Sequence, residues 1–169
     1  MHDSSSRRYS LRVKGYDYSQ AGAYVVTVCT HRRLLLFGDI IEANVRLNEI
    51  GTIVNQSWAN LPKHYAGVEL DAFVVMPNHV HGIVILSDEP HTRYCIPEIL
   101  RGFKTFSART ANEHRRPGAA LWQRGYYEHV IRDERALNRI RADIAHNPAR
   151  WTDDPENISP GEITERGRV

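Results

Sequence analysis

The chemically most distinctive residues of this sequence are two histidines, His79 and His81, in the run Met-Pro-Asn-His-Val-His at 76–81. Because alternate residues of a strand point to the same face, both imidazoles would project together while Val80 faces the other way. Two neighbouring imidazoles can hold one divalent ion, and polar residues on an otherwise apolar strand usually have a partner. The alternative is a pair of solvated or hydrogen-bonded histidines, and the pair alone leaves both interpretations open.

A third metal ligand would have to come from another element. In the last predicted helix, Asp143 and Asn147 are four residues apart, so their oxygens reach the same side. Two imidazoles with oxygen ligands suit Mg²⁺ or Mn²⁺ better than a structural zinc ion. The alternatives are a solvated acid at Asp143 and an ordinary helix-ending residue at Asn147, directly before Pro148.

Basic residues are concentrated in one region. Residues 101–124 hold six basic side chains against one acidic residue, Glu113, although the whole chain has a net charge of only +2. Basic side chains interleaved with aromatic ones suit a phosphate backbone and stacked single-strand bases. We expect Phe103 and Phe106 to pack in the core instead. The residues that we expect to contact nucleic acid, two of them in an N-terminal basic patch, are Arg12, Lys14, Arg101, Lys104, Arg109, Trp122 and Arg124.

Two tyrosines, Tyr126 and Tyr127, open a predicted strand. A tyrosine can attack a phosphodiester covalently once a metal polarises the phosphate, although adjacent strand tyrosines more commonly serve packing. Cys29 and Cys95 are too few for a disulfide framework or a four-thiolate metal site. We expect both to be buried free thiols.

The hydrophobic pattern predicts the elements that would position these residues. Strands are expected at 23–30, 68–76, 79–86 and 126–131, and helices at 47–61, from Pro97 to about 114, and from a cap at Asp133 to about 145. Between 34 and 45 the pattern is broken, with a turn at Gly38-Asp39 and a short strand near Ile40. The order predicts an α+β, ferredoxin-like split βαβ fold with a central antiparallel sheet and an extra C-terminal helix.

The composition predicts one domain. The chain has 169 residues, of which 41% are hydrophobic and 25% charged, as is ordinary for a globular protein. We expect a flexible basic arm at 1–10, a single domain at 11–152 and a polar tail at 153–169. No apolar run is long enough for a membrane helix, and no apolar stretch follows the N-terminus as in a signal peptide. We therefore expect a cytoplasmic protein without a membrane partner.

Four blocks of the sequence resemble the REP-associated tyrosine transposases, which are single-tyrosine transposases of the HUH nuclease superfamily. They are residues 12–38, 71–85 with MPNHVHG, 97–110, and 121–151 with YYEHVIRDE, in colinear order. The resemblance implies a ferredoxin-like (RRM-like) sheet with the histidine strand at its centre. It also implies a divalent ion, Mg²⁺ or Mn²⁺, held by His79, His81 and Asn147.

The same resemblance implies an activity. Proteins of this family cleave and rejoin single-stranded DNA near a short hairpin through a 5′-phosphotyrosine, so the implied partner is a REP-like DNA hairpin with single-stranded flanks. The implied location is the cytoplasm, at the nucleoid, and the protein would act as a monomer or a homodimer. An RRM-like RNA binder would have a similar sheet, but it would present stacking aromatics where His79 and His81 lie.

One position departs from the family pattern. The nucleophilic tyrosine should precede Asn147 by four residues, and Asp143 occupies that position. A carboxylate would form an acyl phosphate, which hydrolyses far more readily than a phosphotyrosine. Three hypotheses follow: the chain binds hairpin DNA without cutting it, Asp143 joins the metal site and supports hydrolytic nicking, or Tyr126 or Tyr127 serves as the nucleophile. A cleaving transposase therefore stands against a catalytically impaired hairpin-binding relative.

Overall fold

The computed structural model of the chain describes residues 20–88, 94–116 and 118–157. Its central sheet has four strands, β1 (Gly22–Cys29), β4 (Val68–Met76), β5 (His79–Leu86) and β6 (Tyr127–Ile131), in the order β4-β5-β1-β6. All three neighbouring pairs are antiparallel. The predicted α+β class and central antiparallel sheet are confirmed, and β5, which carries both histidines, is one of the two inner strands.

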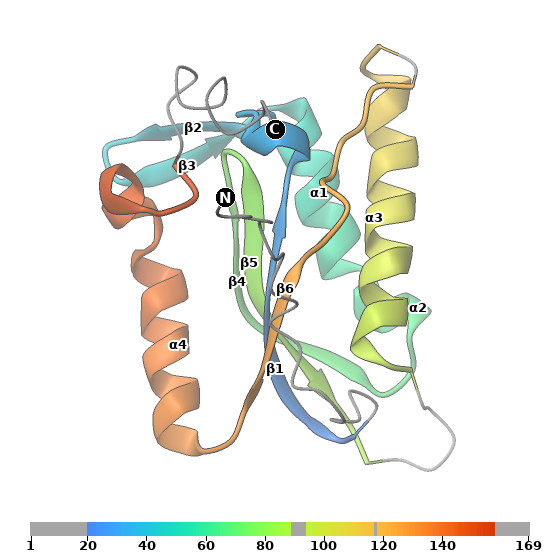
Figure 1. Cartoon of the computed structure of the whole chain (residues 1–169), viewed down its shortest axis with the longest axis vertical. Helices are drawn as coiled ribbons and strands as arrows, with labels where there is room; N and C mark the ends of the chain where they lie inside the picture. The colour runs from blue at the N-terminus through green and yellow to red at the C-terminus, as the bar shows by residue number, and fades with distance from the viewer. Residues whose placement is uncertain (1–19, 89–93, 117, 158–169) are drawn as a thin grey trace, which may run out of the picture.

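Helices cover both faces of this sheet (Figure 1). Helices α1 (Glu49–Ala59), α2 (Leu61–His64) and α3 (Ile96–Glu113) lie on one side, and α4 (Glu134–His146) lies on the other. The carboxylate of Asp133 accepts a hydrogen bond from the backbone of Ala136 and caps α4, as predicted. A 3₁₀ turn, η2 (Pro148–Asp153), continues the chain beyond α4. None of these helices, within the residues described, combines the length and the apolar character needed to cross a membrane.

The alternation of side chains along the strands builds one core on each face of the sheet. Tyr24, Val26 and Val28 of β1 join the larger core beneath α1 and α3, whereas Val25 joins the smaller core beneath α4. The smaller core contains four buried side chains, which are Val25, Ile83, Ile131 and Ile144. The histidine face of β5 is therefore the face that α4 covers.

Gly82 lets β5 lie close to its neighbours on the larger-core side. A Cβ at this position would lie 2.7 Å from Cβ of Phe73 and 2.9 Å from Cζ2 of Trp58. Both of those aromatic residues are packed in the larger core. A side chain at position 82 would therefore push β5, the strand that carries His79 and His81, away from these two rings.

Two predictions of local structure need correction. The region 34–45 contains a complete hairpin, β2 (Gly38–Ile41) with β3 (Asn44–Leu47), in place of a single short strand. Its turn residues, Glu42 and Ala43, adopt the left-handed conformation that tight hairpin turns require. The helix predicted over 47–61 is shorter, because Asn48 caps α1 at its start and a separate helix, α2, begins at Leu61.

Candidate metal site and nucleic-acid interface

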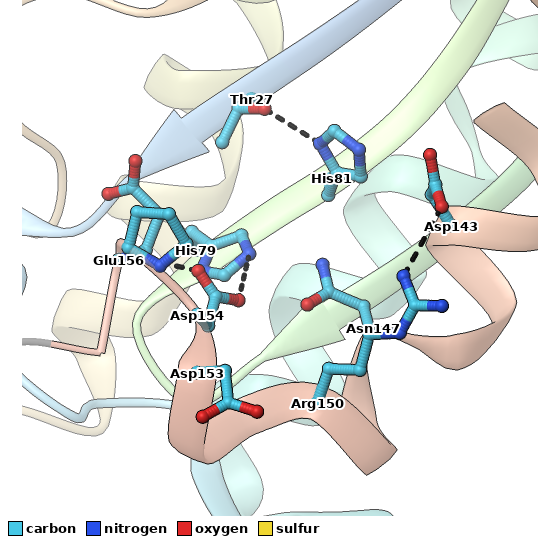
Figure 2. Close-up of a pocket in the computed structure, with 10 residues that line it drawn as sticks. Thr27, His79, His81, Asp143, Asn147, Arg150, Asp153, Asp154 and Glu156 are labelled. Atoms are coloured by element: carbon cyan, nitrogen blue, oxygen red, sulfur yellow. Dashed lines mark hydrogen bonds and ion pairs between the residues drawn. The ribbon is translucent and has the colours of Figure 1, made fainter.

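The two histidines open into a pocket of about 320 Å³ between the start of β5, the C-terminal end of α4 and the segment that follows it (Figure 2). Four carboxylates line this pocket. Its lining residues are Thr27, His79, His81, Asp143, Asn147, Arg150, Asp153, Asp154, Pro155 and Glu156. Asp143 is paired with Arg150 and Glu156 with Arg33, so Asp153 and Asp154 are the carboxylates that would oppose a phosphate group unless a cation were bound.

His79 is a neutral imidazole at the base of the pocket. It is 1% exposed, and burial, aided by the nearby His81 and Arg33, lowers its pKa to about 3. Its Nδ1 lies 2.9 Å from Oδ1 of Asn78. The tautomer that donates this hydrogen bond leaves Nε2 with a free lone pair, 3.9 Å from Oδ2 of Asp154. This is the form in which histidine binds metals.

His81 has a similar arrangement one pleat further along β5. Its Nδ1 lies 2.7 Å from Oγ1 of Thr27 on the neighbouring strand β1. Burial lowers the pKa of His81, and the carboxylates of Asp154 and Asp143 partly oppose this effect. The imidazole is therefore oriented by a hydroxyl on one side and faces carboxylates on the other.

The helix side of the pocket is formed by the last turn of α4. Asp143 and Asn147 both line the pocket, and the Asn147 side chain points toward the histidines (Figure 2). Within the described ranges, no three His, Cys, Asp or Glu side chains are grouped closely enough to form a metal site on their own. The donor set nevertheless fits a hard divalent ion once the amide oxygen of Asn147 is included with the two neutral imidazoles.

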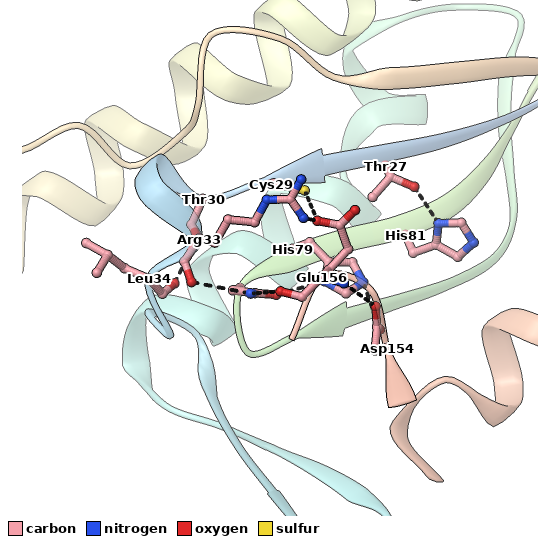
Figure 3. Close-up of polar contacts among 10 residues, drawn as sticks. Thr27, Cys29, Thr30, Arg33, Leu34, His79, His81, Asp154 and Glu156 are labelled. Atoms are coloured by element: carbon pink, nitrogen blue, oxygen red, sulfur yellow. Dashed lines mark hydrogen bonds and ion pairs between the residues drawn. The ribbon is translucent and has the colours of Figure 1, made fainter. Parts of the chain in front are cut away.

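The segment after η2 contributes residues that the sequence placed in a polar tail. Asp154 faces His79, and burial raises the pKa of its carboxyl. Glu156 forms an ion pair with Arg33, and it accepts a hydrogen bond of 3.3 Å from Sγ of Cys29 (Figure 3). Two residues beyond position 152 therefore contact the sheet and the turn after β1. No local pattern could show this, because these acidic residues contact β1 and the turn after it.

The two tyrosines considered as nucleophiles occupy different places. Tyr126 packs against the larger core, whereas Tyr127 is 38% exposed. Tyr127 pairs with Thr27, and Thr27 pairs with His81. Because directly paired residues share a face of the sheet, the Tyr127 and His81 side chains lie on the same face, two strand spacings or roughly 10 Å apart.

Two of the side chains predicted to contact nucleic acid are engaged within the protein. Trp122 is 9% exposed, packs against Phe37 and Phe103, and donates a hydrogen bond of 3.0 Å to Oγ of Ser107. Trp122 is therefore part of the larger core. The ammonium group of Lys104 donates to three successive backbone carbonyls, at residues 123–125. Since these bonds use its donors, Lys104 holds the loop before β6 in place.

The other basic residues remain candidates for DNA contacts. Arg101, Arg109 and Arg124 are exposed, while Arg12 and Lys14 lie outside the described residues. Phe106, which we expected in the core, is 47% exposed. Its ring stacks on His64 at 5.7 Å, and the guanidinium of Arg109 lies 5.3 Å from its centroid.

Comparison with known proteins identifies the family. The family model Transposase IS200 like matches residues 18–147, and the chain belongs to this family of transposases. An uncharacterized protein of Haemophilus influenzae is 35% identical over 164 residues, which cover 87% of this chain and 91% of the relative.

Two solved structures share the fold. A REP-associated tyrosine transposase bound to a REP hairpin superposes with a TM-score of 0.62 at 20% identity, over 86% of this chain and 81% of the other. A protein of Deinococcus radiodurans R1, described as a transposase, has a TM-score of 0.51 at 22% identity, over 79% of this chain and 95% of the other. The predicted family is thus confirmed.

Proposed function

We propose that this chain binds a hairpin-bearing single strand of DNA at the pocket of His79 and His81, together with Mg²⁺ or Mn²⁺. The observation that carries the proposal is the pair of neutral imidazoles whose Nδ1 atoms are engaged by Asn78 and Thr27. The structural relative bound to a REP hairpin supports DNA as the partner. Such a protein would act in the cytoplasm, at the nucleoid.

Each pocket residue has a defined part in this proposal. His79, His81 and Asn147 hold the ion, and when bound it neutralises and orients a DNA phosphate. Asn78 and Thr27 fix the planes of the two rings. The carboxylates of Asp153 and Asp154, among those that line the pocket, make phosphate binding depend on the cation.

We further propose that this chain does not cleave and rejoin DNA through position 143. Asp143 Oδ1 faces Nη1 of Arg150 at 3.5 Å, so a cation already lies beside this carboxylate. Attack by a carboxylate on a phosphodiester would give an acyl phosphate. Water would hydrolyse this intermediate before the 3′-hydroxyl of a second DNA strand could react with it. Hairpin binding without rejoining is therefore the function that the geometry supports best.

A second candidate function is cleavage through Tyr127. The observation that favours it is the shared sheet face of Tyr127, Thr27 and His81. The reaction would form a bond between the Tyr127 oxygen and phosphorus and break the bond from phosphorus to the 3′ oxygen, which would leave as a 3′-hydroxyl carrying the phenol proton. It would require the DNA phosphate to lie on the β1 side of the pocket.

A binding experiment tests the proposal. Fluorescence anisotropy would measure affinity for DNA hairpins with single-stranded flanks, taken from the sequence beside the protein's own gene, and calorimetry would measure Mn²⁺ binding. The double variant His79→Ala/His81→Ala is expected to lose Mn²⁺ binding and the Mn²⁺-dependent part of its DNA affinity, and to keep the affinity that hairpin contacts outside the pocket supply. His129→Ala is the matched control, because His129 is exposed on the same sheet face but outside the pocket.

Absence of hairpin binding by the unaltered chain, with or without Mn²⁺, would overturn the proposal. Unchanged Mn²⁺ binding by the double variant would overturn the assignment of the metal ligands. A covalent protein–DNA adduct on the unaltered chain that Tyr127→Phe abolishes would establish the second candidate in place of the first.

A further inference from the structure

Two adjacent leucines are exposed in the segment Arg32–Leu35, which we call the leucine loop and which is tied to the pocket residue Glu156 by the ion pair of Arg33. Leu34 is 42% exposed and Leu35 is 50% exposed. The next two residues, 36 and 37, turn inward to the larger core. A single exposed leucine needs no explanation. Two in succession, among only five large apolar side chains exposed in the described residues, indicate a surface that a binding partner covers.

The leucine loop is held in a fixed conformation. Arg32 and Arg33 adopt left-handed backbone angles, with φ of 53° and 56°, which are unfavourable for side chains of this kind and persist only where the surroundings impose them. Oγ1 of Thr30 donates to the carbonyl of Leu34 at 2.8 Å. The backbone N–H of Leu36 donates to the carbonyl oxygen of Pro77 at 2.9 Å. The leucines are thus presented on a rigid turn.

The same turn is connected directly to the histidines. Asn78 contacts Nδ1 of His79 through Oδ1, and it donates from Nδ2 to the carbonyl of Arg33 at 3.3 Å and to that of Glu156 at 2.6 Å. Leu34 lies at the outer end of this chain of contacts, and its side chain points away from the pocket (Figure 3). A DNA strand that leaves the pocket on this side would meet the leucine loop next.

We infer that Leu34 and Leu35 form a wedge against which a base of the DNA strand packs outside the pocket, with Arg32 contacting the backbone phosphate beside it. This inference rests on the proposed function. A nucleobase has apolar faces and is flanked by phosphates, and the leucine loop pairs two apolar side chains with an exposed cation. Leucine is one of the side chains that proteins insert between bases. The wedge would fix how many nucleotides separate the hairpin from the phosphate in the pocket.

The test uses the double variant Leu34→Ser/Leu35→Ser. Its matched control is Ile41→Ser, because Ile41 is also 42% exposed but lies in the β2–β3 hairpin. The probe is a DNA hairpin with single-stranded flanks in which 2-aminopurine replaces one flanking base at a time. We expect the unaltered chain and Ile41→Ser to raise the fluorescence at one position, as the base unstacks. The double variant should lose this signal and bind roughly 5- to 150-fold more weakly.

Each other outcome decides a different point. No DNA binding by the unaltered chain would overturn the proposed function and the wedge together. Normal DNA binding by the double variant, with the fluorescence change retained, would overturn the wedge alone. A change in the double variant's sedimentation with unaltered DNA affinity would show that the leucines join two copies of the chain, which also overturns it. Arg32→Ala should lower the salt dependence of binding by about one phosphate contact, and an unchanged dependence would contradict that contact.

Discussion

Oδ1 of Asp143, in the last turn of α4, lies 3.5 Å from Nη1 of Arg150, in the 3₁₀ turn that follows the helix. The acidic side chain thus occupies the place that the family resemblance gives to a tyrosine nucleophile, and a cation faces it. Both side chains are more than half exposed, so their attraction is screened by solvent. Replacing Asp143 with a larger side chain would therefore sacrifice only a weak ion pair.

The variant Asp143→Tyr is expected to gain a covalent adduct with DNA. It places a phenol four residues before Asn147, on the face of α4 that lines the pocket. A radiolabelled hairpin strand incubated with Mn²⁺ should then migrate with the protein on a denaturing gel. The unaltered chain and Asp143→Phe should give no adduct. If Asp143→Tyr binds hairpin DNA and Mn²⁺ but still gives none, a missing nucleophile is not what prevents cleavage.

Acidic pH is expected to destabilise the metal-free protein through His79. Its pKa is about 3 in the folded chain and 6.5 in the absence of the fold, so only the unfolded chain takes up this proton between those values. Above pH 6.5, His79 is neutral in both the folded and the unfolded chain and does not reduce stability. Between pH 6.5 and about 3, it lowers the free energy of unfolding by up to about 1.4 kcal/mol for each unit by which the pH falls. Urea unfolding in EDTA at several pH values would measure this.

The variant His79→Gln provides the comparison for the pH experiment. It keeps a hydrogen-bonding side chain but removes the proton site, so its stability should vary less steeply than that of the unaltered chain between pH 6.5 and 5. His81, whose pKa burial also lowers, accounts for part of the remaining slope. Equal slopes for the two proteins would mean that His79 is not the buried neutral group described above.

Lys104 and Arg101 are expected to act on different properties, although they lie on the same helix. Lys104→Met should lower the free energy of unfolding by about 1–2 kcal/mol, because three loop carbonyls lose a charged donor. Arg101→Met should leave stability within about 0.5 kcal/mol and weaken DNA binding in a salt-dependent way. Thermal unfolding and DNA titrations at two salt concentrations would measure both. The reverse pattern would show that Lys104 contacts DNA, as the sequence predicted.

The ion pair between Asp71 and Arg141 is expected to hold α4 against the sheet. Nε of Arg141 donates to Oδ1 of Asp71 at 2.9 Å, and Nη2 donates to Oδ2 at 2.5 Å. This contact is the main reason that the pKa of Asp71 lies below its ordinary value. In Asp71→Asn, backbone amides of α4 should exchange with solvent deuterium faster, while those of β1 and β5 stay protected. Glu69→Gln, an exposed change on the same strand, should alter neither set.

The sequence predicted correctly what depends on local periodicity. The alternation in β5 placed His79 and His81 on one face, and Asp133 was recognised as the cap of α4. The spacing of Asp143 and Asn147 likewise put both at the pocket. These features follow from the geometry of one strand or one helix, so a single sequence contains them.

Residues whose position depends on distant contacts were misplaced. Trp122 lies in a loop without periodicity, and only its contacts with Phe37 and Phe103 show that it belongs to the core. Phe106 is one turn from Phe103 but falls on the edge of the buried face of α3. Asp154 was assigned to a tail because its neighbours are polar, although its partner His79 is 75 positions earlier in the chain.

The contacts of Glu156 have a consequence for biosynthesis. This residue reaches Cys29 and Arg33, which are among the first described residues to be translated, whereas Glu156 is among the last. A nascent chain that already contains both histidines and all of α4 still lacks part of the pocket wall. The complete pocket is therefore available only to a chain that has been translated at least as far as Glu156 and has folded back across its own first strand.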